Sequence, residues 1–234
     1  MISALLAAMC CLVIPEAGAQ ESAAIVFLDN AEDLKPVPGG HADRAYIAEG
    51  VATRLKDYHA LIIEQPEIFF DPESKYQGIK VDTLKRFADD FASYVRAELE
   101  GSYEIVDQAG PGVLHVRWAF TNLRLKYKWS KRPLSYTPIG AAANEIRKAR
   151  RDDITEKVSL RGVVVEFELL DSQTGERLVA AVESRRKEDE PTTWPELEAL
   201  MRSYGRLLEC RLDNARIPPE QWIDCVATFA VASE

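Results

Sequence analysis

Apolar residues recur at helical spacing in two stretches of the chain. Both stripes have steps of three and four residues, with charged residues falling between them. The first comprises Leu84, Phe87, Ala88, Phe91, Val95 and Leu99, and the second comprises Leu197, Leu200, Met201, Tyr204, Leu208 and Leu212. Each stripe predicts a helix that packs one face on a core. Asp82 is the expected N-cap of the first helix, and Thr193 with Glu196 is a candidate capping box for the second.

Strict alternation marks the strands. Leu114, Val116, Trp118 and Phe120 share one strand face, with His115, Arg117 and Thr121 opposite. Val163, Val165, Phe167 and Leu169 share a face in a predicted hairpin whose turn is DSQTGER. Residues 59–70 are apolar and β-prone. Pro66 lacks a donor for the ladder, so we expect a bulge or an edge strand there.

The order of these elements predicts an α+β fold. Strand, helix, two strands, a crossover, a hairpin and a final helix form a single mixed or antiparallel β-sheet with helices packed on it. We expect one domain over residues 55–213, after an irregular lead-in over 20–54. A tail over 214–234 should pack on the domain through an apolar face made by Trp222, Ile223, Val226 and Phe229.

The N-terminus predicts export. The apolar run MISALLAAMCCLVI is too short to span a bilayer, and Ala17-Gly18-Ala19 provides a small-x-small cleavage site. We therefore expect residues 1–19 to be a signal peptide and the protein to be periplasmic. A buried N-terminal element is one alternative. Lipid attachment at Cys10 or Cys11, with outer-membrane anchoring, is another, although Met9 is not the small residue expected before an acylated cysteine.

After such cleavage only Cys210 and Cys225 remain in the chain. Two cysteines in an oxidising compartment predict one disulfide. Two separate buried thiols are the alternative.

Charge argues against nucleic acid as a partner. The 234 residues carry 38 acidic and 29 basic side chains, a net charge of −9, which repels a phosphate backbone. The basic clusters at 124–132 and 147–151 are typical of a solvated face. Within the first, Tyr127, Trp129, Arg132 and Tyr136 form a candidate interaction surface. Alternatively, Tyr127 and Trp129 close the core.

The stretch FFDPESKYQGI is interpreted as a turn. A calcium loop that began at Asp71 and Glu73 would need an oxygen ligand where Lys75 stands and a glycine where Tyr76 stands. His41, His59 and His115 are far apart and lack metal-type spacing. We expect no functional metal and no cofactor.

Catalytic signatures are sparse. The chain has no Gly-x-Ser-x-Gly elbow, phosphate-binding loop or dinucleotide fingerprint. Glu166 and Glu168 share a strand face at about 7 Å, near the separation used by glycosidases. Two charges on a solvent-facing strand are the simpler interpretation, so no catalytic residue is assigned.

Three segments carry a family resemblance: FFDPESKYQGI with VDTLKRFADDF, VDQAGPGVLHVRWAFTNL, and ELLDSQTGERLVAAV. Together they resemble a family of bacterial envelope proteins catalogued as domain of unknown function 3313, over roughly residues 55–212. The resemblance implies an envelope location, often as a lipoprotein, and brings no site residues. The tail from Arg216 onward is not part of the pattern.

These observations favour a non-catalytic periplasmic interaction module, with no transmembrane span, that binds another envelope protein or itself. Two alternatives remain. One is an envelope hydrolase that uses carboxylates, and the other is a carrier for a small apolar ligand between helix and sheet.

Overall fold

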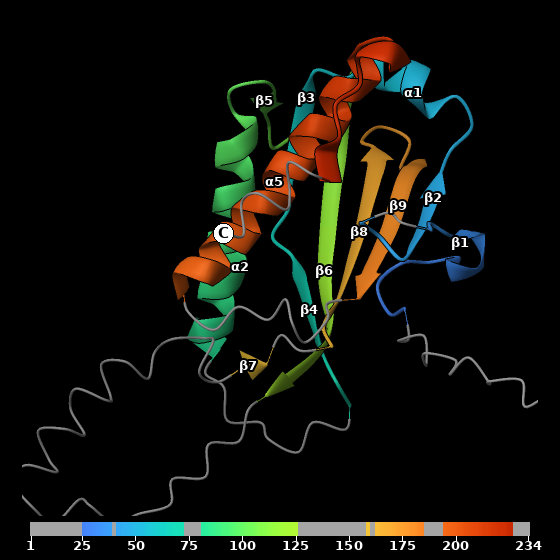
Figure 1. The fold of residues 1–234 in the computed structure, drawn as a ribbon. Helices are drawn as coiled ribbons and strands as arrows, with labels where there is room; N and C mark the ends of the chain where they lie inside the picture. The colour runs from blue at the N-terminus through green and yellow to red at the C-terminus, as the bar shows by residue number, and fades with distance from the viewer. Residues whose placement is uncertain are drawn as a thin grey trace, which may run out of the picture.

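The computed structural model describes residues 25–38, 41–72, 81–125, 158–159, 162–184 and 194–226. Within these ranges one mixed sheet has the strand order β1-β2-β9-β8-β6-β3-β5, and β4 and β7 also pair with β6 (Figure 1). The strands are β1 (Lys35–Pro36), β2 (Arg44–Ile47), β3 (Ala60–Ile63), β4 (Glu67–Phe70), β5 (Glu104–Ile105), β6 (Val113–Leu125), β7 (Val158–Ser159), β8 (Val164–Asp171) and β9 (Arg177–Ser184).

The sheet is mixed because β3 and β4 run parallel to β6, whereas β8 runs antiparallel to it. The two long helices, α2 (Val81–Leu99) and α5 (Trp194–Arg216), cover one face (Figure 1). The shorter helical elements are α1 (Val51–Arg54), η1 (Ala31–Asp33), η2 (Leu55–Asp57) and η4 (Pro219–Gln221). The predicted α+β class is confirmed.

The main core lies between the two helices and the sheet. Phe91 is fully buried, and its ring centroid lies 5.4 Å from that of Trp118 and 5.1 Å from that of Phe120. Gly205 lets the helices approach, since a Cβ there would lie 2.9 Å from the Cβ of Glu98. Both predicted helical stripes and the predicted inward faces of β6 and β8 contribute to this core.

One residue changes the alternation of β6. Asn122 has a φ of 58°, in the left-handed region, and its amide donates to the carbonyl of Gly162 at 2.7 Å. Thr121 keeps its place on the far face of the sheet, whereas Leu123, which strict alternation would also place there, is 1% exposed and joins the core on the helix side.

Several local expectations need correction. The region around Pro66 is divided into two strands, β3 and β4, because the proline and its neighbours leave the ladder. Asp82 is not an N-cap, since α2 already includes Val81. The lead-in expected over 20–54 contributes β1 and β2 to the sheet, with β2 paired to β9. Thr193, of the candidate capping box, lies outside the described residues.

The C-terminal segment is held by the predicted disulfide. Cys210 and Cys225 are bonded, with a Cα–Cα distance of 5.7 Å, and both are buried beside Leu207. The Asn214 side chain donates to the carbonyl of Ile223 at 2.9 Å and accepts its N–H at 3.0 Å. These contacts turn Cys225 inward.

The expected apolar face of the tail does not lie on the domain. Trp222 is 51% exposed, Ile223 is 59% exposed and Val226 is also exposed. The disulfide and the Asn214 amide fix the backbone so that these side chains point to solvent. Phe229 lies outside the described residues. Within the part of the chain that the structure covers, no helix combines the length and apolarity needed to cross a membrane.

Candidate functional site

The face of the sheet away from α2 and α5 contains two buried carboxylates. Glu166 is 0% exposed and Glu168 is 4% exposed. We expected these side chains to face solvent, and this was wrong. Residues 25–34, which we call the N-terminal arm, lie against this face and contact the Glu166 carboxylate directly.

Glu166 binds the main chain of the arm. Its carboxylate accepts the N–H groups of Val26, Phe27 and Leu28 at 3.0, 2.9 and 2.9 Å. It also accepts the hydroxyl of Thr121 at 2.9 Å. A carboxylate has about four acceptor sites, so these four donors occupy its hydrogen-bonding capacity. Three successive main-chain N–H groups thus converge on one carboxylate.

The arm is also held by apolar and cationic contacts. Leu28 and Leu34 pack in a small second core with Val164, Ala180 and Val182. Two arginines donate to main-chain carbonyls of the arm. Arg177 donates to the carbonyl of Asp29 at 2.6 Å, and Arg44 donates to those of Ala31 and Leu34 at 2.8 and 3.0 Å. The guanidinium of Arg117 lies 4.7 Å from the centroid of the Phe27 ring.

Glu168 lies between two arginines. Arg117 donates to one carboxylate oxygen at 2.6 Å, and Arg177 donates to the other at 3.1 Å. The ion pairs continue from Arg117 to Glu67 at 3.0 Å and to Glu64 at 3.6 Å. Opposite charges compensate each other across this network, which offsets the cost of burying Glu168.

This arrangement bears on the chemistry expected of a carboxylate pair. A general acid or base must reach the reacting group, either directly or through one water. Both carboxylates are instead buried, and the donors of the protein itself occupy them. In this conformation they fasten the arm and the strands to one another.

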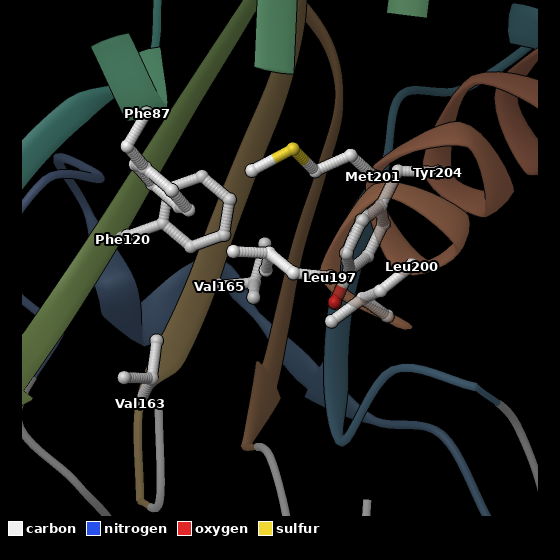
Figure 2. Close-up of a pocket in the computed structure, with 8 residues that line it drawn as sticks. All are labelled: Phe87, Phe120, Val163, Val165, Leu197, Leu200, Met201 and Tyr204. Carbon is white, nitrogen blue, oxygen red and sulfur yellow. The ribbon is translucent and has the colours of Figure 1, made fainter. Parts of the chain in front are cut away.

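A cavity of about 20 Å³ lies between the helices and the sheet. Figure 2 shows the side chains that converge on it: Phe87, Phe120, Val163, Val165, Leu197, Leu200, Met201 and Tyr204. This volume holds about one water molecule. It is far below the 300–1,000 Å³ or so that is typical of ligand pockets.

A polar cleft of about 190 Å³ lies beside the β8–β9 turn, lined by Arg54, Asp57, Tyr58, Gly112 and Asp171. The Tyr58 hydroxyl donates to Asp171 at 2.7 Å. Burial, together with this carboxylate, raises the pKa of Tyr58 to about 12. The same hydrogen bond and the N–H groups of the turn hold the pKa of Asp171 below its ordinary value. Asp171 also accepts the N–H groups of Gln173 and Thr174, so its role is that of a turn residue.

The other sequence candidates do not converge on one site. Tyr127, Trp129, Arg132 and Tyr136 lie outside the described residues, as do Glu73 and Lys75. Asp71 is buried, and its N–H donates to the carbonyl of Leu123 at 3.0 Å.

The three histidines lie apart. His41 pairs with Glu183 at 2.9 Å, His115 pairs with Glu64 at 2.8 Å, and His59 lies beside Gly112. Among the described residues, no three His, Cys, Asp or Glu side chains are grouped so that they could hold a metal ion.

Sequence reasoning missed the arm and its acceptor. The run Ile25–Leu28 is apolar and is followed at once by Asp29 and Asn30. This run was the available signal for a segment that packs on the domain, but it is too short to show a period.

The architecture defines a class: an α+β protein whose mixed sheet is covered by two helices on one face and, in part, by its own N-terminal arm on the other. Within this class, the family model described as "Protein of unknown function (DUF3313)" matches residues 26–208, and the chain belongs to that family. The match begins inside the arm. A search of the curated proteins returns no match.

Two solved structures show a remote likeness. A PelC dodecamer from Paraburkholderia phytofirmans is 14% identical, with a TM-score of 0.31, over 65% of this chain and 86% of that chain. A putative neuraminyllactose-binding hemagglutinin homolog from Helicobacter pylori is 11% identical, with a TM-score of 0.33, over 76% of this chain and 90% of that chain. Likenesses this distant carry no inference about function.

Proposed function

We propose that this DUF3313 protein is an exported, non-catalytic module of the bacterial envelope that works by binding another envelope protein or a second copy of itself. The proposal rests on the burial of Glu166 and Glu168 and on their hydrogen bonds within the chain. These carboxylates are the strongest catalytic candidates in the sequence, and both are buried and occupied by donors of the same chain. Their use as structural acceptors favours binding over hydrolysis.

The location rests on two features. The Cys210–Cys225 disulfide is stable in an oxidising compartment and rare in the cytosol. The apolar N-terminal run followed by Ala17-Gly18-Ala19 fits a secretory signal. Together they support export, with Gln20 as the first residue of the mature chain.

Export is tested by the intact mass of the tagged full-length chain, recovered from the periplasm of a Gram-negative host. The proposal expects a chain that starts at Gln20 and carries an oxidised Cys210–Cys225 pair. A chain that keeps Met1, or one acylated at Cys10 or Cys11, contradicts the proposed cleavage.

Binding is tested in the cell with a photo-crosslinking residue at Trp129 or Tyr136. A matched control carries the same group at Val81, which is 78% exposed on α2. The proposal expects a discrete adduct, with itself or with one envelope protein, from position 129 or 136 and none from 81. If all three positions give only the uncrosslinked monomer, the result argues against the proposal. Glycan or peptide turnover by the purified chain establishes the hydrolase instead.

A further inference from the structure

The N-terminal arm is fastened to the body mainly through its main chain. Three of its N–H groups bind Glu166, and three of its carbonyls bind Arg177 and Arg44. Side chains that bind main-chain groups accept any copy of the same segment with the same geometry, as in the recognition of extended peptides. Glu166, Arg177 and Arg44 can therefore bind the arm of a neighbouring copy as well as the arm of their own chain.

The arm forms a packing unit separate from the main core. Its apolar contacts belong to the small second core with Val164, Ala180 and Val182, whereas α2 and α5 pack in the large core on the other face. Withdrawing the arm would leave the helices and the ring cluster around Phe91 in place. It would also deprive Glu166 of three main-chain donors and of the segment that buries it. The uncovered face around Glu166 would then be available to another copy of the arm.

The connection from the arm to the body has few contacts. β1 pairs with β2 through two residues only, Lys35 with Ala45 and Pro36 with Arg44. The N–H of Val37 donates to the carbonyl of Asp43 at 3.0 Å. Separating Val37 from Asp43 would break that bond and the short pairing while leaving the β2–β9 ladder intact.

From these features we propose that the arm is exchangeable and that the sheet face around Glu166 binds the arm of a second copy of this chain. In the exchanged dimer each arm crosses to the partner and makes all the contacts that it makes in the closed chain. The two forms then differ in the hydrogen bond between Val37 and Asp43 and in the entropy of association. This inference rests on the self-association branch of the proposed function, to which it adds the surface and the partner.

The experiment follows the arm with isotopes. The exported chain is prepared with ¹⁴N and with ¹⁵N, each carrying Phe27→p-benzoylphenylalanine, and the two samples are mixed, unfolded and refolded with the disulfide intact. After illumination of the dimeric fraction, mass spectrometry identifies the isotopes of each crosslink from position 27 to β6 or β8. Random pairing of exchanged chains gives about half of the crosslinks between ¹⁴N and ¹⁵N peptides.

Crosslinks confined to a single isotope overturn the proposal, and so does the absence of a dimeric fraction at the highest soluble concentration. Glu166→Gln should lower the total yield of crosslinks from position 27 to β6 or β8 at least several-fold. The matched Glu67→Gln, at an exposed member of the ion-pair network, should leave that yield unchanged. A negative result leaves binding to another envelope protein standing, because that branch is tested separately by the crosslinks from positions 129 and 136.

Discussion

The two faces of the sheet are covered by different physical means. On the helix side, α2 and α5 satisfy their own main-chain hydrogen bonds and contribute only side chains, so rings and aliphatic groups fill the interface. On the arm side, the covering segment has no ladder for the N–H groups of residues 26–28. Glu166 provides the acceptor that a helix or strand would otherwise provide. The comparison shows how an irregular segment can be part of a fold when a buried carboxylate binds its main chain.

The largest effect is expected on the helix side. Phe91→Ala removes a fully buried ring that contacts Trp118 and Phe120, and it should lower the free energy of unfolding by about 4 kcal/mol. Urea unfolding measures this loss. The exposed Val81→Ala, on the same helix, should change the free energy by less than about 0.5 kcal/mol. Similar losses from both variants would contradict a core centred on Phe91.

The C-terminal segment extends the helix side and depends on a covalent bond. Cys225→Ser opens a link across 15 residues, which is worth about 3 kcal/mol at most by the chain-entropy estimate. We expect amide exchange to rise around Ile223 while the strands stay protected. A change that spreads into β6 would show that the bond supports the sheet itself. Thiol labelling of the denatured, non-reduced wild-type chain provides the control, with no reaction expected at these two cysteines.

On the arm side, the expected loss in the free energy of unfolding is smaller, and its effect is local. Glu166→Gln keeps the shape but replaces one acceptor oxygen with a donor that faces the N–H groups of the arm, for an expected loss of about 2 kcal/mol. The exposed Glu67→Gln should cost well under half of that. Parallel urea titrations measure both. Equal losses of stability in the two variants would contradict the assignment of Glu166 as the acceptor that holds the arm.

The smallest effect concerns Tyr58, near the β8–β9 turn. Its pKa is raised from 10.0 to about 12, so the folded state favours the neutral hydroxyl. The resulting stability is complete below pH 10.0 and is lost as the pH rises through about 12. Tyr58→Phe should therefore flatten part of the fall in stability in this range. An unchanged pH profile would contradict the raised pKa of Tyr58, which burial and the hydrogen bond to Asp171 cause.

The pH dependence of Asp171 has the opposite direction. Its pKa lies below 3.8, so its contribution is present above that pH and is lost on acidification. Asp171→Asn should reduce the acid sensitivity of unfolding. An unchanged acid limb in urea titrations would show that this carboxylate does not stabilise the turn.

Sequence periodicity predicted the helix side well. The stripes of α2 and α5 and the inward face of β6 follow from the spacing of apolar residues, because burial on one side leaves a period. The pairing of Cys210 with Cys225 was predicted from the two cysteines that would remain after the expected cleavage, and it is confirmed.

The arm side could not be predicted in this way. The residues of β8 alternate Val, Glu, Phe, Glu, a pattern typical of a strand with one face in solvent. The segment that buries Glu166 comes from about 140 positions earlier in the chain, and its N–H donors leave no trace in residue type. The outward orientation of Trp222 and Ile223 similarly depends on the Asn214 side chain, which binds the main chain of Ile223. The spacing of residue types along the sequence does not reveal this contact.

Native-state hydrogen exchange at the amides of Val26, Phe27 and Leu28 tests the central claim most directly. If Glu166 fastens the arm, these three amides should be protected in the wild-type chain, and their protection should fall sharply in Glu166→Gln. The β6 amides should keep theirs. Exchange of all three amides at the rate of an unfolded chain in the wild-type protein would contradict the account.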